Sequence, residues 1–181
     1  IDVRKFNLKA LRKKIGFIRQ KNLLFTGTIK SNIKFGKPHA THDEVENSAK
    51  IAQAYDFITT KEKGFDEPIS EGGSNVSGGQ KQRLSIARAL VRKSEIYIFD
   101  DSFSALDFKT DAILRKALKK ETKDAIVLIV AQRIGSIMDA DKIIVLDEGK
   151  VVGVGKHKEL LSTCNVYHEI ALSQLTEEEL A

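Results

Sequence analysis

Two short segments carry residues whose types and spacing could do chemistry, and the first is Ser77-Gly78-Gly79-Gln80. It stands directly before a stretch with helical periodicity. Glycines at a helix start let a ligand approach the backbone closely, and the free N–H groups with the helix dipole favour an anion. The Ser77 hydroxyl adds a donor. Taken alone, the segment is more simply interpreted as a serine N-cap after a flexible loop.

The second segment is the apolar run Ile96–Phe99, which ends in Asp100 and Asp101. A carboxylate at the C-terminal tip of a buried parallel strand lies where open α/β sheets bind ligands. In nucleotide hydrolases such an aspartate orients Mg²⁺. Taken alone, Asp100 could also be a turn or helix-capping residue.

The elements that must position these segments follow from the pattern of apolar residues. Short apolar runs alternate with amphipathic stretches in the second half of the chain, which indicates a parallel sheet covered on both faces. Thr41 and Glu44 have the spacing of a capping box and predict a helix that continues to about Ile58. The other expected helices are Leu8–Lys14, one opening at Ser77, Thr110–Lys120 and Asn165–Leu180, and the expected strands are Ile15–Ile18, Ile96–Phe99, Ala125–Ala131, Lys142–Leu146 and Lys150–Val154.

Composition excludes several classes of protein. The chain has 181 residues, 30 Lys+Arg, 25 Asp+Glu and a net charge of +5, which fits one domain with a core. The single Cys164 rules out an intrachain disulfide framework. The longest wholly apolar run, Ala125–Ala131, is far shorter than the ~20 residues that cross a bilayer. Basic clusters do not alternate with aromatic residues, so no nucleic-acid partner is expected.

In chain order, the motifs together resemble the nucleotide-binding domain of ABC transporters over nearly the whole sequence. Gln20 after IGFIR resembles the Q-loop, and LLFTGTIKSNIKFG resembles the stretch that follows it in exporters. ISEGGSN resembles the loop before the signature, VSGGQ the signature itself, and IYIFD the Walker B strand. Ser104–Asp107 resembles the D-loop, and Gln132 after AIVLIVA stands at the switch-histidine position.

This resemblance implies an α/β fold with a P-loop NTPase-like parallel-sheet core and an α-helical subdomain, whose N-terminal part is missing. Residues 1–181 then form a partial ABC ATPase domain. Residues 21–93 are expected to be the helical subdomain with the signature. Residues 94–160 are the core with Walker B, the D-loop and the switch position, and residues 161–181 are a C-terminal helix.

The resemblance also implies the site and its ligands, ATP and Mg²⁺. Asp100 and Gln20 would hold the metal, while Asp101, Gln20 and Gln132 stand at catalytic positions. The nucleotide-binding residues would be Ser77, Gly78, Gly79, Gln80 and Asp107. The parent protein would be an ATPase at the cytoplasmic face of the cell membrane that couples ATP binding and hydrolysis to export. Its partners would be a transmembrane domain and a second nucleotide-binding domain.

Three departures from the family pattern bear on activity. The sequence holds no G-x-x-x-x-G-K-[ST], so the chain is expected to be truncated after Walker A and inactive in isolation. Asp101 stands where active members carry a glutamate, and its shorter side chain withdraws the carboxylate by roughly 1.5 Å from the water that a base must reach. Gln132 replaces the histidine and cannot carry a positive charge.

The last two departures fall in one ATP site, which predicts that this chain's own site is degenerate. Its intact signature would instead complete the site of the partner domain. FDDSFSALD with AQR resembles the degenerate subunit of bacterial heterodimeric multidrug exporters. Two alternatives stay open: a soluble ABC ATPase of DNA repair or translation, and a regulatory ABC domain without catalysis.

Other polar residues have plainer interpretations. Arg83 and Arg88 could reach phosphate or a partner's carboxylates, or could form a charged outer face of their helix. His157 and His168 are expected to be surface histidines.

Overall fold

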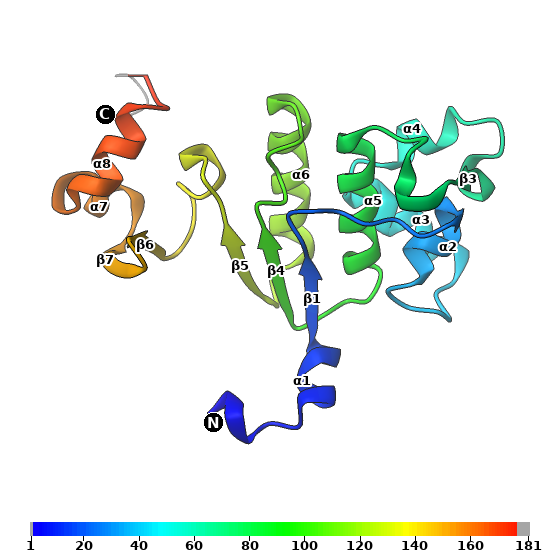
Figure 1. The fold of residues 1–181 in the computed structure, drawn as a ribbon, viewed down its shortest axis with the longest axis horizontal. Helices are drawn as coiled ribbons and strands as arrows, with labels where there is room; N and C mark the ends of the chain where they lie inside the picture. The colour runs from blue at the N-terminus through cyan, green and yellow to red at the C-terminus, as the bar shows by residue number, and fades with distance from the viewer. Residues whose placement is uncertain (1, 177–181) are drawn as a thin grey trace. The chain divides into compact units, whose positions relative to one another are not determined.

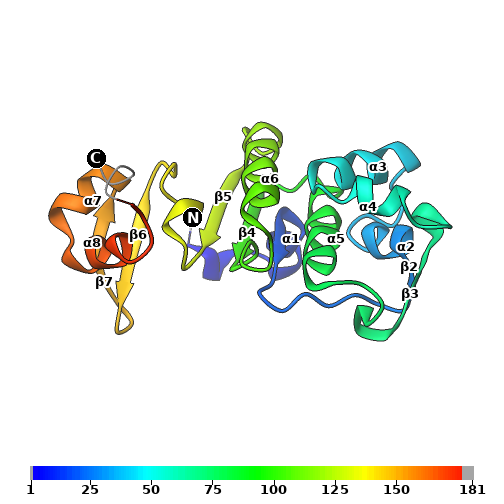
Figure 2. The ribbon, with the colours of Figure 1, turned by 90° about the horizontal axis from the view of Figure 1, so that it is seen from above.

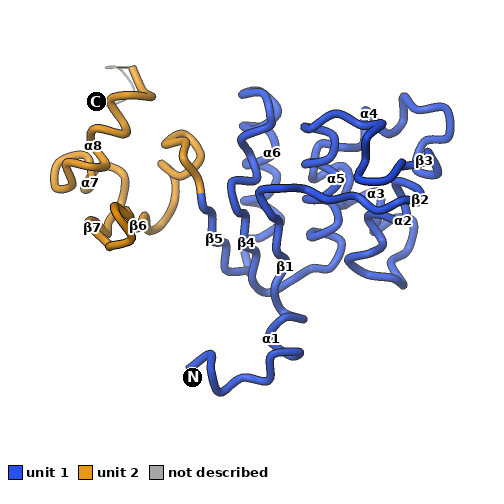
Figure 3. The backbone as a smooth tube through the Cα atoms, viewed as in Figure 1, with its two compact units in different colours: residues 1–130 blue, residues 131–181 orange. Residues whose placement is uncertain are grey.

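The computed structural model describes residues 2–176 and divides the chain into two compact units, residues 1–130 and 131–181 (Figure 1, Figure 3). Unit 1 holds the signature segment, Gln20 and both aspartates, and unit 2 holds Gln132. Among the described residues, no helix is long and apolar enough to cross a membrane.

The centre of unit 1 is a three-stranded parallel sheet in the order β1–β4–β5. Its strands are β1 (Ile15–Ile18), β4 (Ile96–Asp100) and β5 (Ile126–Val130). The register is given by Ile15 opposite Ile96, and Ile96 opposite Ile126. Because the three strands run in parallel, their carboxyl ends meet at one edge. Gln20 is the second residue after β1, and Asp101 is the first after β4.

A group of helices lies beside strand β1. Helix α5 (Gly78–Leu90) lies between the sheet and the other members of this group (Figure 1, Figure 2). Those members are α2 (Ile29–Lys34), α3 (His42–Ile51), α4 (Tyr55–Thr59) and the short antiparallel pair β2 (Gly27–Thr28) and β3 (Pro68–Ile69). Fully buried aliphatic residues such as Leu84 join these helices to the sheet in one core.

The capping box predicted at Thr41 and Glu44 is confirmed, but the helix that it opens is shorter than expected. Thr41 accepts a hydrogen bond from the Glu44 N–H, and the Glu44 carboxylate accepts from Thr41 in return. The expected continuation to Ile58 is wrong. The backbone turns left-handed at Gln53 (φ 55°), and the Ala54 N–H bonds back to the Ala49 carbonyl, which ends α3.

The remaining elements of unit 1 complete its core. Helix α6 (Phe108–Glu121) buries Leu114 and Leu118 in the same core as Phe99. At the N-terminal side, a 3₁₀ turn (Val3–Lys5) precedes α1 (Leu8–Lys14), whose N-cap is Asn7. Two further 3₁₀ turns, Gly64–Asp66 and Glu71–Gly73, lie in the loop before α5.

Unit 2 corrects the expectation that the strand after residue 141 extends the parallel sheet. Strand β6 (Ile143–Asp147) pairs antiparallel with β7 (Lys150–Gly155). The connecting residues Glu148 and Gly149 both have positive φ, 46° and 76°, which is the backbone of a tight hairpin turn. A two-residue hairpin can join only antiparallel strands.

The end of the chain also differs from expectation. A 3₁₀ turn (Ile134–Ser136) precedes the hairpin, and two short helices, α7 (His157–Thr163) and α8 (Asn165–Leu172), follow it. The predicted terminal helix to Leu180 therefore ends at Leu172, and residues 177–180 lie outside the described part. His157 is buried rather than at the surface, and its Nδ1 lies 2.8 Å from the Tyr167 hydroxyl. His168 is exposed, as expected.

Within unit 1, the described residues do not cover both faces of the apolar strand β5. Ile126, Leu128 and Val130 are 68%, 51% and 51% exposed, although they belong to an uninterrupted apolar strand. Burial was expected because parallel strands of this composition usually have helices on both sides.

Candidate functional site

The carboxyl ends of β1 and β4 bring two of the predicted site residues together. Ile18 is the register partner of Phe99, so both strands leave the sheet at the same level. Beyond that level, the Gln20 Nε2 donates to the Asp101 Oδ2 at 3.2 Å. Two residues that lie 81 positions apart in the chain therefore share one site, and each keeps a side-chain oxygen available for a further ligand.

The backbone of Asp101 is held in an uncommon conformation. Its φ of 45° is left-handed, a region that aspartate enters more readily than most residues with a side chain. The Asp101 N–H donates to the Val130 carbonyl of β5 at 2.9 Å, and the Asp101 carbonyl accepts from the Ser104 hydroxyl at 3.1 Å. These bonds fix the direction in which the carboxylate leaves the strand end.

Asp100 is the last residue of β4 and is partly buried. In the part of the chain that the structure describes, no group of three or more His, Cys, Asp and Glu side chains could hold a metal ion. Magnesium needs no such group, since it is commonly bound by one or two carboxylates together with water and substrate phosphates. The oxygens of Asp100, Asp101 and Gln20 fit that requirement.

The signature segment forms the start of α5. The Ser77 Oγ accepts from the Gln80 N–H at 3.3 Å, and the Gln80 Oε1 accepts from the Ser77 N–H at 3.1 Å. This capping box occupies the Gln80 oxygen, so the nucleotide-binding role predicted for Gln80 is left to its amide nitrogen. The Ser77 hydroxyl acts as an acceptor in the cap and keeps its own hydrogen to donate.

The two glycines of the signature have different surroundings. A Cβ added to Gly79 would lie 3.3 Å from the Ala105 carbonyl, so the D-loop segment packs closely against the start of α5. A Cβ added to Gly78 would meet nothing within 4 Å. The open space at Gly78, with the free N–H groups of the first helical turn, fits a phosphate group.

Asp107 caps another helix. Its Oδ1 accepts from the Thr110 N–H at 2.9 Å at the start of α6, and hydrogen bonding to Thr110 holds the pKa of Asp107 below its usual value. The Asp107 charge also acts on Arg83 of α5, whose pKa is lowered by burial and raised in part by Asp107. Asp107 therefore lies at the D-loop end that faces the signature helix.

The two arginines of α5 hydrogen-bond to backbone carbonyls of neighbouring segments within unit 1, a role that the sequence did not indicate. Arg83 donates to the Gln53 carbonyl at 2.7 Å. Arg88 donates to the carbonyls of Leu23 and Asn32 and to the Asn32 Oδ1, each at 2.9 Å. Burial lowers the pKa of Arg88. Neither the phosphate role nor the charged outer face describes these residues, and no local spacing could have indicated their backbone partners.

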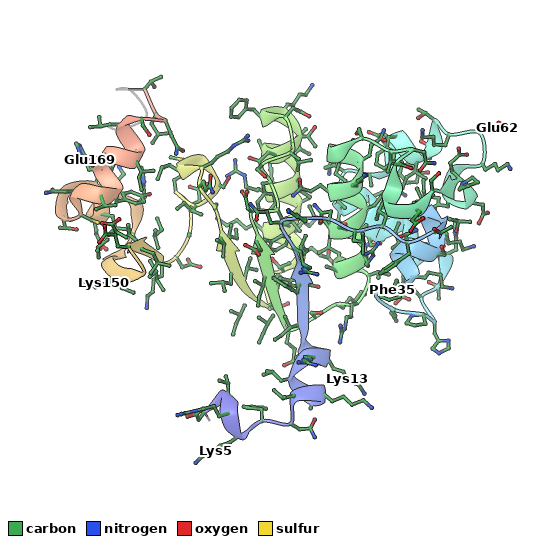
Figure 4. All side chains as sticks on the ribbon, viewed as in Figure 1. Lys5, Lys13, Phe35, Glu62, Lys150 and Glu169 are labelled. Carbon is green, nitrogen blue, oxygen red and sulfur yellow. The ribbon has the colours of Figure 1, made fainter. Side chains whose placement is uncertain are left out.

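A hollow of about 310 Å³ lies beside the segment that follows Gln20. Its apolar lining includes Phe25 and Phe35, whose rings lie 4.6 Å apart with the Arg88 guanidinium over them. Phe35 is 65% exposed and projects at the edge of the helical group (Figure 4). Arg19, Lys21 and Arg92 make the rest of this surface basic, and its lining among residues 2–176 includes no acidic residue. No motif in the sequence indicates this surface.

Gln132, the residue at the switch position, belongs to unit 2. Its side chain is exposed, and its carbonyl accepts from the Gln174 Nε2 at 2.8 Å. The structure thus brings Gln20 and Asp101 together beside Asp100 in unit 1, places the Gly79 backbone against the D-loop segment, and assigns Gln132 to the other unit.

Comparison with known proteins gives consistent results. A family model described as "ABC transporter" matches residues 1–104, which include Gln20, the signature segment and both strand-end aspartates. An uncharacterized ABC transporter ATP-binding protein of Mycobacterium tuberculosis is 42% identical over 96% of this chain and 30% of the relative. A putative multidrug export ATP-binding/permease protein of Staphylococcus aureus is 43% identical over 93% of this chain and 29% of the relative.

A solved structure of a bacterial Atm1-family ABC exporter with ATP bound matches with a TM-score of 0.93 and 35% sequence identity. The match covers 97% of this chain and 31% of that chain. This chain therefore spans about a third of the length of the proteins that it resembles.

Proposed function

Because this chain belongs to the ABC transporter family, we propose that it is the ATP-binding part of an exporter, coupling ATP binding and hydrolysis to export across a membrane. One observation carries the proposal. Gln20 and Asp101 meet at the carboxyl ends of β1 and β4, beside Asp100, as a nucleotide and its metal require. In this proposal residues 21–93 form the helical subdomain with the signature, and residues 94–160 carry the Walker B strand, the D-loop and the switch position.

At the strand edge, the side chains of this chain would hold and orient the metal and the nucleotide. Magnesium bound with ATP would supply neutralisation of the phosphate charge. Asp100 would give it a carboxylate oxygen, and Gln20 an amide oxygen. Asp101 would stand at the position of the base that takes a proton from the attacking water, but its short side chain, already hydrogen-bonded to Gln20, would not reach that water well.

The signature segment would serve a second nucleotide-binding domain. Ser77 would donate its hydroxyl hydrogen, and the backbone of Gly78 and Gly79 its N–H groups, to the terminal phosphate of ATP held by that partner. Asp107 would contact the same partner across the interface. With Asp101 and Gln132 at the catalytic positions, this chain's own site would be degenerate and the pair a heterodimer.

The transmembrane partner would dock at the hollow beside Gln20, and the domain would lie at the cytoplasmic face of the membrane. The aromatic pair Phe25 and Phe35 offers apolar contact, and the basic side chains around it favour an acidic segment. The docked segment would lie next to the loop that carries Gln20, so movement of that loop would reach the membrane helices.

Transport by the assembled transporter in inside-out vesicles tests this proposal. ATP-dependent accumulation of a dye substrate is expected in the wild type, and its absence would contradict an export function. Asp101→Asn should leave ATP turnover within about twofold, since the partner's site would do the hydrolysis, whereas the partner's equivalent substitution should abolish it. Loss of turnover with Asp101→Asn would overturn the degenerate site.

A further inference from the structure

Ser102 is a fully buried polar residue that none of the motif roles uses. It stands directly after Asp101, and its relative exposure is 0%. Its hydroxyl donates to the Ile18 carbonyl at 3.1 Å and also lies 3.3 Å from the Asp100 carbonyl. A hydroxyl has a single hydrogen to share between these acceptors. Ser102 therefore joins the last residues of β1 and β4 by one side chain.

This link lies beyond the end of the strand pairing. The β1–β4 register stops at Ile18 and Phe99, so the chain that leads from Ile18 to Gln20 is no longer held by the ladder. Ser102 holds the Ile18 carbonyl, only two residues before Gln20. On the opposite side, the Asp101 N–H is held by the Val130 carbonyl of β5.

The contact between Gln20 and Asp101 depends on this arrangement. It is a single exposed hydrogen bond of 3.2 Å, which could not by itself hold two chain segments together. The backbone segments that carry Gln20 and Asp101 must therefore be held by other bonds. Ser102 supplies one of them, because it is bonded to the segment that leads to Gln20.

We propose that Ser102 is a positioning residue, whose buried hydroxyl fixes the exit of β1 and thereby sets Gln20 against Asp101 for metal-nucleotide binding. The inference rests on the proposed function, because it assumes that this edge holds the metal of a bound nucleotide. Outer partners that orient metal ligands commonly change metal affinity by about 10- to 100-fold when they are removed.

The assembled transporter with a non-hydrolysable ATP analogue provides the test, with Mn²⁺ in place of Mg²⁺ so that binding is followed by electron paramagnetic resonance. The binding phase lost in Asp100→Asn belongs to this chain. Ser102→Ala should raise the Mn²⁺ concentration that half-saturates this phase by about tenfold. Gln20→Ala should raise it similarly, and the double variant should be no worse than the worse single variant, because both act through one contact.

Ser48→Ala is the matched control, since Ser48 is also buried and its hydroxyl donates to the Val45 carbonyl at 2.8 Å within α3. It removes the same kind of bond and should lower thermal stability without moving Mn²⁺ affinity. Hydrogen exchange of residues 19–22, measured without metal, should rise in Ser102→Ala and stay unchanged in Ser48→Ala.

The outcomes separate the two claims. A wild-type protein with no phase sensitive to Asp100→Asn overturns the proposed function and this inference with it. A wild-type phase that Ser102→Ala leaves unchanged, or additive effects of Ser102→Ala and Gln20→Ala, overturns the inference alone. If Ser48→Ala shifted the half-saturating Mn²⁺ concentration as much as Ser102→Ala, the Ser102 effect would be one of general stability. That result would also overturn the inference.

Discussion

The two candidate nucleotide-contacting regions of unit 1 are built in different ways. The start of α5 is made by neighbours in the chain, since Ser77 and Gln80 cap each other across three residues. The strand edge is made by residues about 80 positions apart, which meet only because β1 and β4 pair in register. The first region is therefore a local property of one helix, and the second exists only when the core of the unit has formed.

The largest effect that separates the two regions should come from Phe99→Ala. Phe99 is 1% exposed in β4 and stacks on Phe103 at 5.3 Å between ring centroids. Its truncation should lower the free energy of unfolding by about 3–5 kcal/mol, through lost burial and a cavity. Denaturant unfolding followed by circular dichroism measures the loss. A loss below about 1 kcal/mol would mean that the strand edge does not depend on this core.

A smaller effect is expected at the local region. Ser77→Ala removes the acceptor for the Gln80 N–H and should cost about 1 kcal/mol, which is usual for an N-cap serine. The same unfolding measurement applies, with Ser77→Asn as the control because asparagine caps equally well. If both variants lost the same stability, the cap would not be the cause.

The D-loop cap should show a weaker effect that depends on pH. The pKa of Asp107 is lowered by its bonds to Thr110, so its charge stabilises the folded state above the unfolded pKa near 3.8. That contribution is lost as the pH falls through the still lower folded pKa. Asp107→Asn keeps a cap, so it should be slightly less stable than the wild type at pH 7, by less than Ser77→Ala. The difference should shrink at pH 3, and a difference independent of pH would contradict the assignment.

The smallest effect should come from Gln20→Ala. Its hydrogen bond to Asp101 is exposed, so removing it should change the free energy of unfolding by less than about 0.5 kcal/mol. Thermal unfolding beside the wild type checks this. A larger loss would show that the contact between Gln20 and Asp101 helps to hold the strand edge, in conflict with an edge fixed by strand pairing and by Ser102.

This difference also explains which features the sequence could predict. The caps at Thr41 and Ser77 were visible because their partners lie three residues away, where a helix start places them. Asp100 was visible because an apolar run ends there. The family motifs led to Gln20, but no spacing in the sequence revealed that its amide contacts Asp101.

The errors have the same origin. Arginine is usually a surface residue, yet Arg88 donates hydrogen bonds to two backbone carbonyls and a side-chain amide oxygen more than 50 positions away. His157 was expected at the surface because nothing in the sequence indicated its hydrogen-bond partner. That partner, Tyr167, lies on the next helix, α8. The strand after residue 141 was expected to be parallel because its apolar composition resembles that of β5, while the turn at Glu148 and Gly149 decides its direction.

The uncovered strand β5 has a consequence for handling the protein in solution. It is the last strand in the order of its sheet, and it contains no charged residue and no proline. An open edge of this kind offers unpaired backbone groups to a strand of another molecule. Aggregation should therefore increase with protein concentration, and Leu128→Lys, at a half-exposed position, should raise solubility.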